Sequence, residues 1–277
     1  MANPSRDALT FPLSESQKLD PYLPPPHLPP DKIHVTLTFA TSLDSSLSLS
    51  PGVQTALSGP ASKAMTHYLR SKHDAILVGV GTVIADDPSL NCRIEGVGGY
   101  GGEGLVGQPR PVVLDPRRRW AVRKESKVVR LAGDGRGRGP WVIGIEKEEE
   151  IVEDRSGEAV LTGVGGKVLE IPASACLSSE AGFRMDWRTV FDLLLREGVR
   201  SIMIEGGGAI INDLLHPSNF ALVDTVIVTI APTWLGQGGV QVCPDARVEG
   251  GAKVPVGRLQ DVKWVPLGED VVLCGRP

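Results

Sequence analysis

The strongest constraint on the fold is a series of short apolar runs that recur along the chain. Each run is rich in Val, Ile and Leu and is bounded by Gly, Pro or polar residues. Such runs are typical of strands buried on both faces of a parallel sheet, whose crossover connections are usually helices. The runs are residues 74–79, 110–115, 140–145 and 200–204. They predict an α/β fold, and 277 residues provide one large domain or two small ones.

Helix signals lie between these runs. Residues 60–72 can be helical, and residues 187–195 place apolar side chains at the spacing of an amphipathic helix that ends before Gly198. A further helix should follow the glycines at 206–208 and continue through Leu215.

The two ends of the folded region predict further strands. Residues 33–39 are β-branched and read as the first strand, and residues 223–231 read as a long later one. Residues 262–265 and 271–274 then predict a closing hairpin around Gly268. The sequence therefore predicts a mixed, mainly parallel sheet flanked by helices, with antiparallel C-terminal edge strands.

Composition divides the chain into an arm and a domain. Eight of the 22 prolines lie in the first 30 residues, which favours an extended surface arm over residues 1–32 and a single domain over residues 33–277. An SH3-type ligand is the alternative for the arm. Residues 95–108, with seven glycines, and residues 146–155, with six acidic side chains, look like insertions.

Charge and cysteine content exclude several classes of protein. A net charge of -4 and a pI near 5.8 disfavour generic nucleic-acid binding. Four scattered cysteines without a CxxC pair, and histidines without HExxH, predict no disulfide framework and no metal site. The sequence has neither a long apolar span nor a secretory leader, so we expect no membrane partner and a cytoplasmic location.

Three consecutive glycines follow the strand expected at 200–204. Glycine within ordered structure costs stability, so Gly206, Gly207 and Gly208 need a physical reason. A strand–glycine–helix turn lets a pyrophosphate approach the backbone amides, although the spacing is neither that of a dinucleotide fingerprint nor that of a P-loop. Tight helix–strand packing is the alternative. Glu205 would face the same crevice at the carboxyl edge of the sheet.

A second strand-to-helix turn begins at Gly79. Thr82 stands where a helix N-cap is expected, and Asp86, four residues later, lies on the same helical face. Pro88 then ends the helix. Amides at such a turn attract anions, whereas the alternative is a capped turn with Asp86 and Asp87 solvated.

Several stretches together resemble one family. They are residues 41–44, 65–70, 74–90, 110–115, 205–207, 223–225, 231–232 and 235–236. The string Gly-Thr-Val-Ile-Ala-Asp-Asp-Pro at 81–88 is the most specific. The chain resembles the reductases of riboflavin biosynthesis, and among them the stand-alone fungal type, over about residues 33–274. Ser45 departs from the family, which often has glycine there, and residues 95–108 have no counterpart that we can place.

The resemblance implies a dihydrofolate-reductase-like fold, a homodimer and NADPH as the hydride donor. It also implies a small-molecule substrate, 2,5-diamino-6-ribosylamino-4(3H)-pyrimidinone 5′-phosphate, reduced at ribose C1′ to the ribitylamino product. The residues it assigns to the cofactor are Thr82, Asp86, Glu205, Gly206, Gly207, Gly208, Ala209 and Ile210. Those it assigns to the substrate are Arg70, Leu90, Arg93 and Glu205.

The expected chemistry depends on positioning more than on acid–base power, because the cofactor carries the hydride. Arg70 and Arg93 suit a phosphate clamp, since guanidinium groups bind phosphate through paired hydrogen bonds. No catalytic dyad is apparent, and Glu205 and Asp44 are the candidates for catalytic groups. A reductase acting on another pterin or pyrimidine and a non-catalytic NADP-binding regulator are the alternatives. The HxE and PCxxC signature of a fused zinc deaminase is absent from the sequence.

Overall fold

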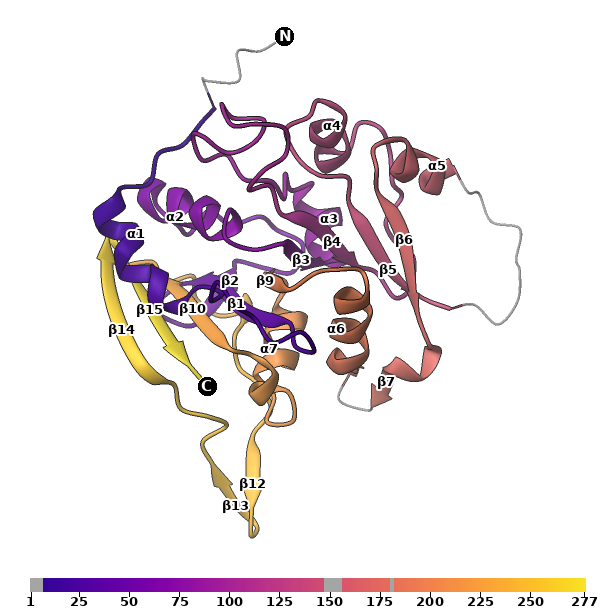
Figure 1. Cartoon of the computed structure of the whole chain (residues 1–277). Helices are drawn as coiled ribbons and strands as arrows, with labels where there is room; N and C mark the ends of the chain where they lie inside the picture. Colours follow the sequence, from indigo (N-terminus) through magenta and orange to yellow (C-terminus); the bar gives the residue numbers. More distant parts are fainter. Residues whose placement is uncertain (1–6, 147–155, 180–181) are drawn as a thin grey trace.

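One large sheet organises the molecule (Figure 1). The computed structural model describes residues 7–146, 156–179 and 182–277, and within them this sheet has nine strands in the order β14-β15-β10-β1-β9-β3-β4-β5-β6. All neighbours from β10 to β6 run parallel, whereas β15 and β14 are added antiparallel at one edge. The expected mixed, mainly parallel sheet with antiparallel C-terminal strands is confirmed. The strands are β1 (His34–Thr41), β3 (Ala75–Gly79), β4 (Arg110–Leu114), β5 (Trp141–Ile145), β6 (Lys167–Ile171), β9 (Ser201–Glu205), β10 (Thr225–Ile230), β14 (Gln260–Leu267) and β15 (Asp270–Arg276).

Helices cover both faces of the sheet. Successive side chains of β3 alternate between the faces: Ala75 and Leu77 join the core under α6 and α7, while Ile76 and Val78 join the core under α3, α4 and α5. The two groups of helices lie on opposite sides of the strands in Figure 1. The helices are α2 (Pro60–Arg70), α3 (Val80–Asp86), α4 (Lys127–Gly133), α5 (Ser156–Gly163), α6 (Trp187–Arg196) and α7 (Gly208–Leu215).

Short elements complete the chain. A hairpin of β12 and β13 projects away from the body of the molecule (Figure 1). The short strands are β2 (Ser46–Ser48) with β11 (Val240–Gln241), β7 (Cys176–Ser179) with β8 (Gly182–Met185), and β12 (Arg247–Glu249) with β13 (Ala252–Val254). The 3-10 turns are η2 (Asp20–Tyr22), η3 (Ala173–Ala175) and η4 (Phe220–Leu222). Of the acidic insertion at 146–155, all but Glu146 lies outside the described residues.

The N-terminal segment differs from the extended surface arm that we expected. It contains helix α1 (Leu13–Leu19), and Leu19 and Tyr22 are buried in a core cluster with α2, β14 and β15. The high proline content of residues 1–30 led us to expect an extended segment. The helix nevertheless forms because Leu13–Leu19 contains no proline and lies between prolines at 12 and 21. The division of the chain at residue 33 stays a prediction.

Two kinds of feature are absent from the described residues. They contain no helix that is long and apolar enough to cross a membrane. In the same part of the chain, no three His, Cys, Asp or Glu side chains come together as a group that could hold a metal ion.

Candidate functional site

The carboxyl ends of β3 and β9 bring two helix starts together. The two strands are neighbours in the sheet and run parallel, so the turns into α3 and α7 leave the same edge. Open α/β sheets bind ligands in the crevice at this edge. The two glycine turns that the sequence identified therefore lie side by side.

The glycine triplet has a different reason at each end. Gly206 and Gly207 have φ of 48° and 94°, which side-chain-bearing residues rarely adopt. A Cβ on Gly207 would lie 3.3 Å from Thr82 Oγ1, so the two turns are in contact. A Cβ on Gly208 would lie 2.4 Å from a methyl group of Val240, so close packing explains the third glycine. Packing was the alternative raised from the sequence, and it holds for this position.

The start of α7 exposes backbone donors. The first helical hydrogen bond runs from the Ile211 amide to the Gly207 carbonyl (3.1 Å), so the amides of Gly208, Ala209 and Ile210 precede it. Within the described chain, no side chain caps this helix. Uncapped amides at a helix start, next to open backbone at Gly206, form a place where an anion can bind.

Helix α3 starts earlier than we expected. Gly79 is its N-cap, so Thr82 lies in the first turn, and the expected N-cap role of Thr82 is wrong. The reason is that Val80 and Val83, three apart, are both buried in the core below the helix, which fixes the start at Val80. Asp86 ends the helix and is half-buried, and burial raises its pKa while Lys127 lowers it.

Arg70 and Glu205 form a largely buried ion pair beside these turns. Arg70 Nε and Nη2 donate to the two carboxylate oxygens of Glu205 at 2.7 and 2.6 Å, and Nη1 donates to the Asn91 carbonyl (3.0 Å). Their side chains are only 11% and 18% exposed. Burial opposes the charge on Arg70, but Glu205 outweighs it and raises the pKa of Arg70. Most of the Arg70 fork is thus occupied within the protein.

The segment from Leu90 to Arg93 continues from this pair. Leu90 is buried and has φ of 50°, an uncommon conformation for a large side chain. Arg93 Nε lies 3.3 Å from His67 Nε2, and Nη1 donates to the Asp7 carbonyl at 3.5 Å. No bond to Nη2 is found within the described residues, and the side chain is partly exposed. Arg93 is therefore the freer of the two arginines.

The imidazole of His67, which contacts Arg93, is neutral. Burial, followed by the charges of Arg70 and Arg93, lowers the pKa of His67 to about 2. Its Nδ1 also lies 3.2 Å from the Arg93 amide. A neutral imidazole has one acceptor nitrogen, so only one of its two contacts with Arg93 is a hydrogen bond at a time.

Asp44 ties two loops at the same edge together. Its oxygens accept from the amides of Leu235 (3.2 Å) and Gly236 (2.7 Å), and Ser42 donates to it through its hydroxyl. The bond from Ser42, followed by the two amide bonds, lowers the pKa of Asp44. Ser45, next to it, has φ of 58°, which explains why glycine would suit that position.

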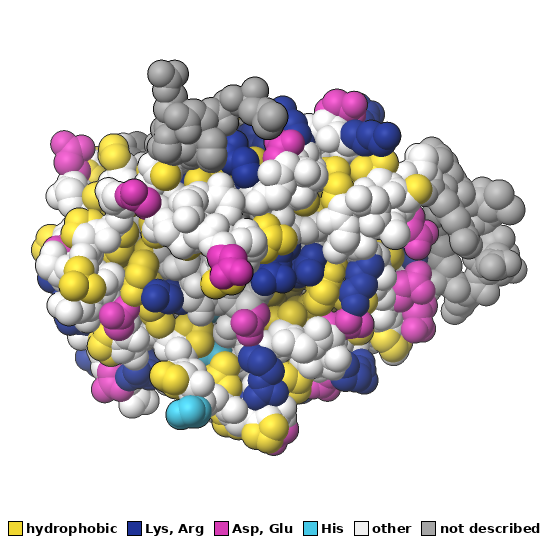
Figure 2. Space-filling view, turned by 45° about the horizontal axis from the view of Figure 1, so that its top comes forward, with side chains coloured by type: hydrophobic (Ala, Val, Ile, Leu, Met, Phe, Trp, Pro, Cys, Tyr) yellow, Lys and Arg dark blue, Asp and Glu magenta, His cyan; other side chains and the backbone are white. Residues whose placement is uncertain are grey.

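The surface offers both charge signs near one another. On the face shown in Figure 2, acidic and basic side chains are mixed, and Lys and Arg side chains gather across its middle beside hydrophobic ones. A local basic region on a protein of net charge -4 suits a small anionic ligand.

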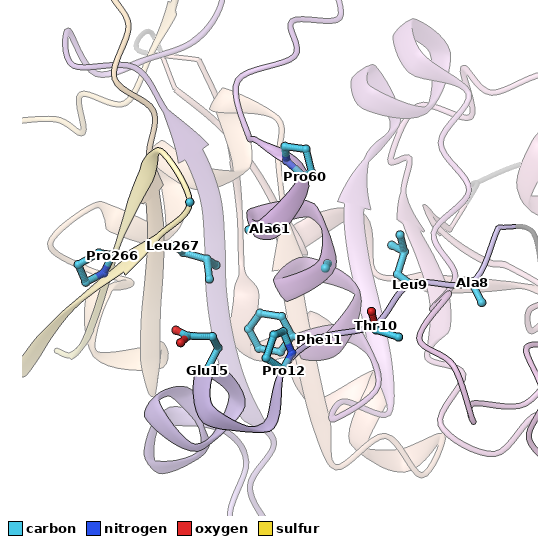
Figure 3. A pocket seen from close by; sticks show the side chains of 12 residues that line it. Ala8, Leu9, Thr10, Phe11, Pro12, Glu15, Pro60, Ala61, Pro266 and Leu267 are labelled. Carbon is cyan, nitrogen blue, oxygen red and sulfur yellow. The ribbon is translucent and has the colours of Figure 1, made fainter.

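A cavity of about 570 Å³ lies elsewhere, between the N-terminal segment, the start of α2 and the β14–β15 turn (Figure 3). Its lining includes Phe11, Ala64 and Leu267, and among the described residues that line it the one ionisable side chain is Glu15, which pairs with Lys18 at 2.8 Å. An apolar, acidic lining does not suit a phosphate. We place the candidate site at the carboxyl edge of the sheet.

Three residues around the site were missed from the sequence. His67 and Gln108 contact the Leu90–Arg93 segment, and Asn91 lies within it and donates to Tyr100 and to the Arg136 carbonyl. The usable signal was at His67, which precedes Arg70 by three positions and so shares its helical face. Asn91 and Gln108 act through contacts between distant parts of the chain, which spacing does not reveal.

The chain is similar to one family of known proteins. The family model described as "RibD C-terminal domain" matches residues 33–273. The 2,5-diamino-6-ribosylamino-4(3H)-pyrimidinone 5′-phosphate reductase of Debaryomyces hansenii is 39% identical over 96% of this chain and 98% of its own length. The reductase of the same name from Saccharomyces cerevisiae is 37% identical over 87% of this chain and 86% of its own.

Solved structures of similar fold come from the same group of proteins. The riboflavin biosynthesis reductase Rib7 of Saccharomyces cerevisiae has a TM-score of 0.68 and 33% identity, covering 94% of this chain and 97% of that one. RibD of Acinetobacter baumannii has a TM-score of 0.64 at 24% identity, covering 89% of this chain and 58% of that longer one, and this likeness concerns the fold alone.

Proposed function

Because the chain belongs to the RibD C-terminal domain family, we propose that it reduces 2,5-diamino-6-ribosylamino-4(3H)-pyrimidinone 5′-phosphate to the ribitylamino product with NADPH. The protein is a reductase of riboflavin biosynthesis. The observation that carries the proposal is the pairing of an open glycine–helix turn with an arginine-bearing segment at one sheet edge, in a chain 39% identical to a reductase of that name.

The residues at the glycine turns fit a dinucleotide. The uncapped amides at the start of α7 and the open backbone at Gly206 can receive a pyrophosphate. Thr82 and Asp86, on one face of α3, would contact the nicotinamide nucleotide, as the family resemblance implies. NADPH, when bound, supplies the hydride.

A basic loop supports NADPH over NADH. Three consecutive arginines, Arg117–Arg119, follow β4, whose carboxyl end lies beside that of β3. The carboxylate of Asp115 accepts from the amides of Arg119 (2.9 Å) and Trp120 (2.8 Å) and bends this loop back. Arg118 pairs with Glu170, whereas Arg119 is exposed and can meet the additional phosphate of NADPH.

The substrate side would bind the pyrimidine ribosyl phosphate. Arg93 binds the 5′-phosphate with the part of its guanidinium group that His67 and Asp7 leave free. The side chain of Leu90 is buried in the core, so Leu90 can contribute to this side only through its backbone. Arg70 holds the Glu205 carboxylate in a fixed orientation between the two sides.

The chemistry then follows from position. The ribose opens to an imine at C1′, a proton goes to the imine nitrogen, and a hydride then adds to C1′, which leaves a secondary amine. Glu205 and Asp44 are the candidates for the catalytic groups. Asp44, whose pKa is lowered, carries its charge at neutral pH and so stabilises positive charge on the imine rather than donating the proton.

A homodimer in the cytoplasm is part of the same proposal. The projecting β12–β13 hairpin supports it, since a two-stranded hairpin is marginal by itself and Val248 on it is 59% exposed. Light scattering on the purified protein tests the dimer, and a fluorescent fusion tests the location. A monomer at working concentration would contradict the first.

The deciding assay follows NADPH oxidation with the ribosylaminopyrimidinone phosphate and, separately, with dihydrofolate. We expect turnover only with the former, and with NADH a lower kcat/KM. Arg119→Ala should narrow the difference between NADPH and NADH. Turnover of dihydrofolate alone would overturn the proposal, and binding of NADPH without turnover of either substrate would indicate a regulator.

A further inference from the structure

The glycine-rich segment at 95–108 is a folded loop with close backbone contacts. The Gly98 amide donates to the Val106 carbonyl (2.8 Å), and the Gly102 amide donates to the Val97 carbonyl (3.0 Å). A Cβ on Gly98 would lie 2.5 Å from the Gly104 carbonyl oxygen. The glycines are needed because the loop folds back on itself.

This loop ends in a side chain that reaches back to the substrate side. Gln108 is 3% exposed, and its Oε1 accepts from the Cys92 amide (2.9 Å). Its Nε2 donates to the carbonyls of Cys92 (2.7 Å) and Gly98 (2.8 Å). The side-chain amide thus pairs with both backbone groups of Cys92, as a neighbouring strand would. The reversed amide would set like groups against each other at every contact.

A second side chain of the loop, that of Tyr100, contacts Asn91, the residue before Cys92. Asn91 is 1% exposed, and its Nδ2 donates to the Tyr100 hydroxyl (2.9 Å) and to the Arg136 carbonyl (2.8 Å). The loop therefore fixes two consecutive residues, Asn91 and Cys92, from one side.

The fixed residues lie between the groups that face the substrate. The Asn91 carbonyl accepts from Arg70, which holds Glu205. Leu90, one residue earlier, keeps a backbone conformation that is unfavourable for its side chain and persists only where its surroundings enforce it. Arg93, one residue later, lies against His67, which accepts a hydrogen bond from either the Arg93 amide or the Arg93 side chain. Rotation of the Cys92 backbone would move all of these groups.

We infer that Gln108 is a positioning residue for substrate binding: it fixes the backbone of Cys92 so that Leu90 and Arg93 keep their places. The inference rests on the proposed function, because that function gives Leu90 and Arg93 their substrate. It assigns a role to the glycine-rich loop, which the cofactor side does not use.

Gln108→Met is the main variant, since it keeps the length and burial of the side chain and removes all three hydrogen bonds. We expect the KM for the ribosylaminopyrimidinone phosphate to rise about tenfold or more, with the Kd for NADPH and kcat changed about twofold at most. The matched control is Asp270→Ala. Asp270 is also buried and bonds to Gly59 and Ser62 at the opposite end of α2, so this control should lose stability without a change in KM.

Gln108→Glu adds a readout that a purely structural role would not move. Its ionised carboxylate keeps the acceptor and loses both donors, whereas the protonated form regains one donor. We expect its KM, divided by that of the wild type at each pH, to fall as the pH is lowered from about 8 to about 6, because burial raises the pKa of a carboxyl group.

The outcomes separate the two proposals. If the wild type does not turn over the phosphate substrate, the proposed function fails, and this inference fails with it. If the wild type turns over but Gln108→Met keeps the wild-type KM, only the positioning role is wrong. Variants that lose NADPH affinity in proportion to KM, or that do not fold, would make Gln108 an ordinary core residue.

Discussion

The two sides of the site are held in place by different means. On the cofactor side, the backbone itself sets the geometry: Gly206 and Gly207 take positive φ, and the amides at the start of α7 lie open. On the substrate side, side chains from distant parts of the sequence fix the Leu90–Arg93 segment, and most of the donors of Arg70 are already occupied.

This difference teaches what each ligand demands. A pyrophosphate is bound by backbone amides that only glycine leaves accessible, so the turn must stay unobstructed. A reacting sugar must be oriented, so its contacts are placed on a segment that is braced from behind. Variants on the two sides should therefore affect different kinetic constants.

The largest effect that separates the sides is expected for Arg93→Ala. Losing a charge-assisted contact with the 5′-phosphate should cost roughly 1.5–3 kcal/mol, or about 10- to 150-fold in kcat/KM, with NADPH affinity nearly unchanged. Steady-state kinetics with phosphorylated and dephosphorylated substrate measure it. An equal loss with both substrates would mean that Arg93 does not bind the phosphate.

The substrate side should also carry a pH signature in stability. The pKa of His67 is lowered from 6.5 to about 2 in the folded protein, so the unfolded chain takes up the proton first and the unfolding free energy falls as pH drops below 6.5. Between about pH 7.5 and about pH 5 the wild type should lose about 2 kcal/mol more than His67→Gln. Denaturant unfolding at the two pH values measures this difference, and parallel losses would show that His67 does not remain neutral.

On the cofactor side, Gly207→Ala should weaken NADPH binding about tenfold, or about 1.4 kcal/mol, and leave the substrate KM nearly unchanged. The physical reason is that φ of 94° becomes strained and a Cβ would approach Thr82. Gly198→Ala is the control, because Gly198 has φ of 85° with open space around it at the end of α6. Fluorescence titration measures the Kd for NADPH of both variants. Equal values would show that the turn at Gly207 does not contribute to cofactor binding.

The smallest effect is expected for Asp86→Ala. This variant should raise the KM for NADPH roughly two- to tenfold, which corresponds to a loss of about 0.5–1.5 kcal/mol of binding free energy. Its melting temperature should change little. The neighbouring Asp87→Ala should do the reverse, because Asp87 caps α4: about 1 kcal/mol of stability lost and KM unchanged. If Asp86→Ala instead lowered stability and Asp87→Ala raised the KM for NADPH, the roles proposed for the two carboxylates would be wrong.

Most of the fold was predictable because its signals are local. The four apolar runs became β3, β4, β5 and β9, and the closing hairpin formed around Gly268, which has a positive φ. The dihydrofolate-reductase-like fold implied by the resemblance is confirmed. Helix α1 was missed, because its burial depends on contacts with β14 and β15 at the other end of the chain.

The site was less predictable. The glycine turns and Arg70 were visible as patterns, but the pairing of Arg70 with Glu205 joins residues 135 positions apart. The start of α3 was misread because its register is set by the burial of Val80 and Val83 beneath the helix, not by the propensity of Thr82 for an N-cap. Long-range contacts such as that of Gln108 with Cys92 leave no spacing to read.

The most direct test of the two-sided site is the fate of the transferred hydrogen. NADPH deuterated at the transferring position of the nicotinamide is incubated with the enzyme and the ribosylaminopyrimidinone phosphate, and the product is examined by NMR. If cofactor and sugar meet at this edge of the sheet, one deuterium is found at C1′ of the ribityl chain. Deuterium lost to water, or bound at another carbon, would contradict direct hydride transfer to C1′.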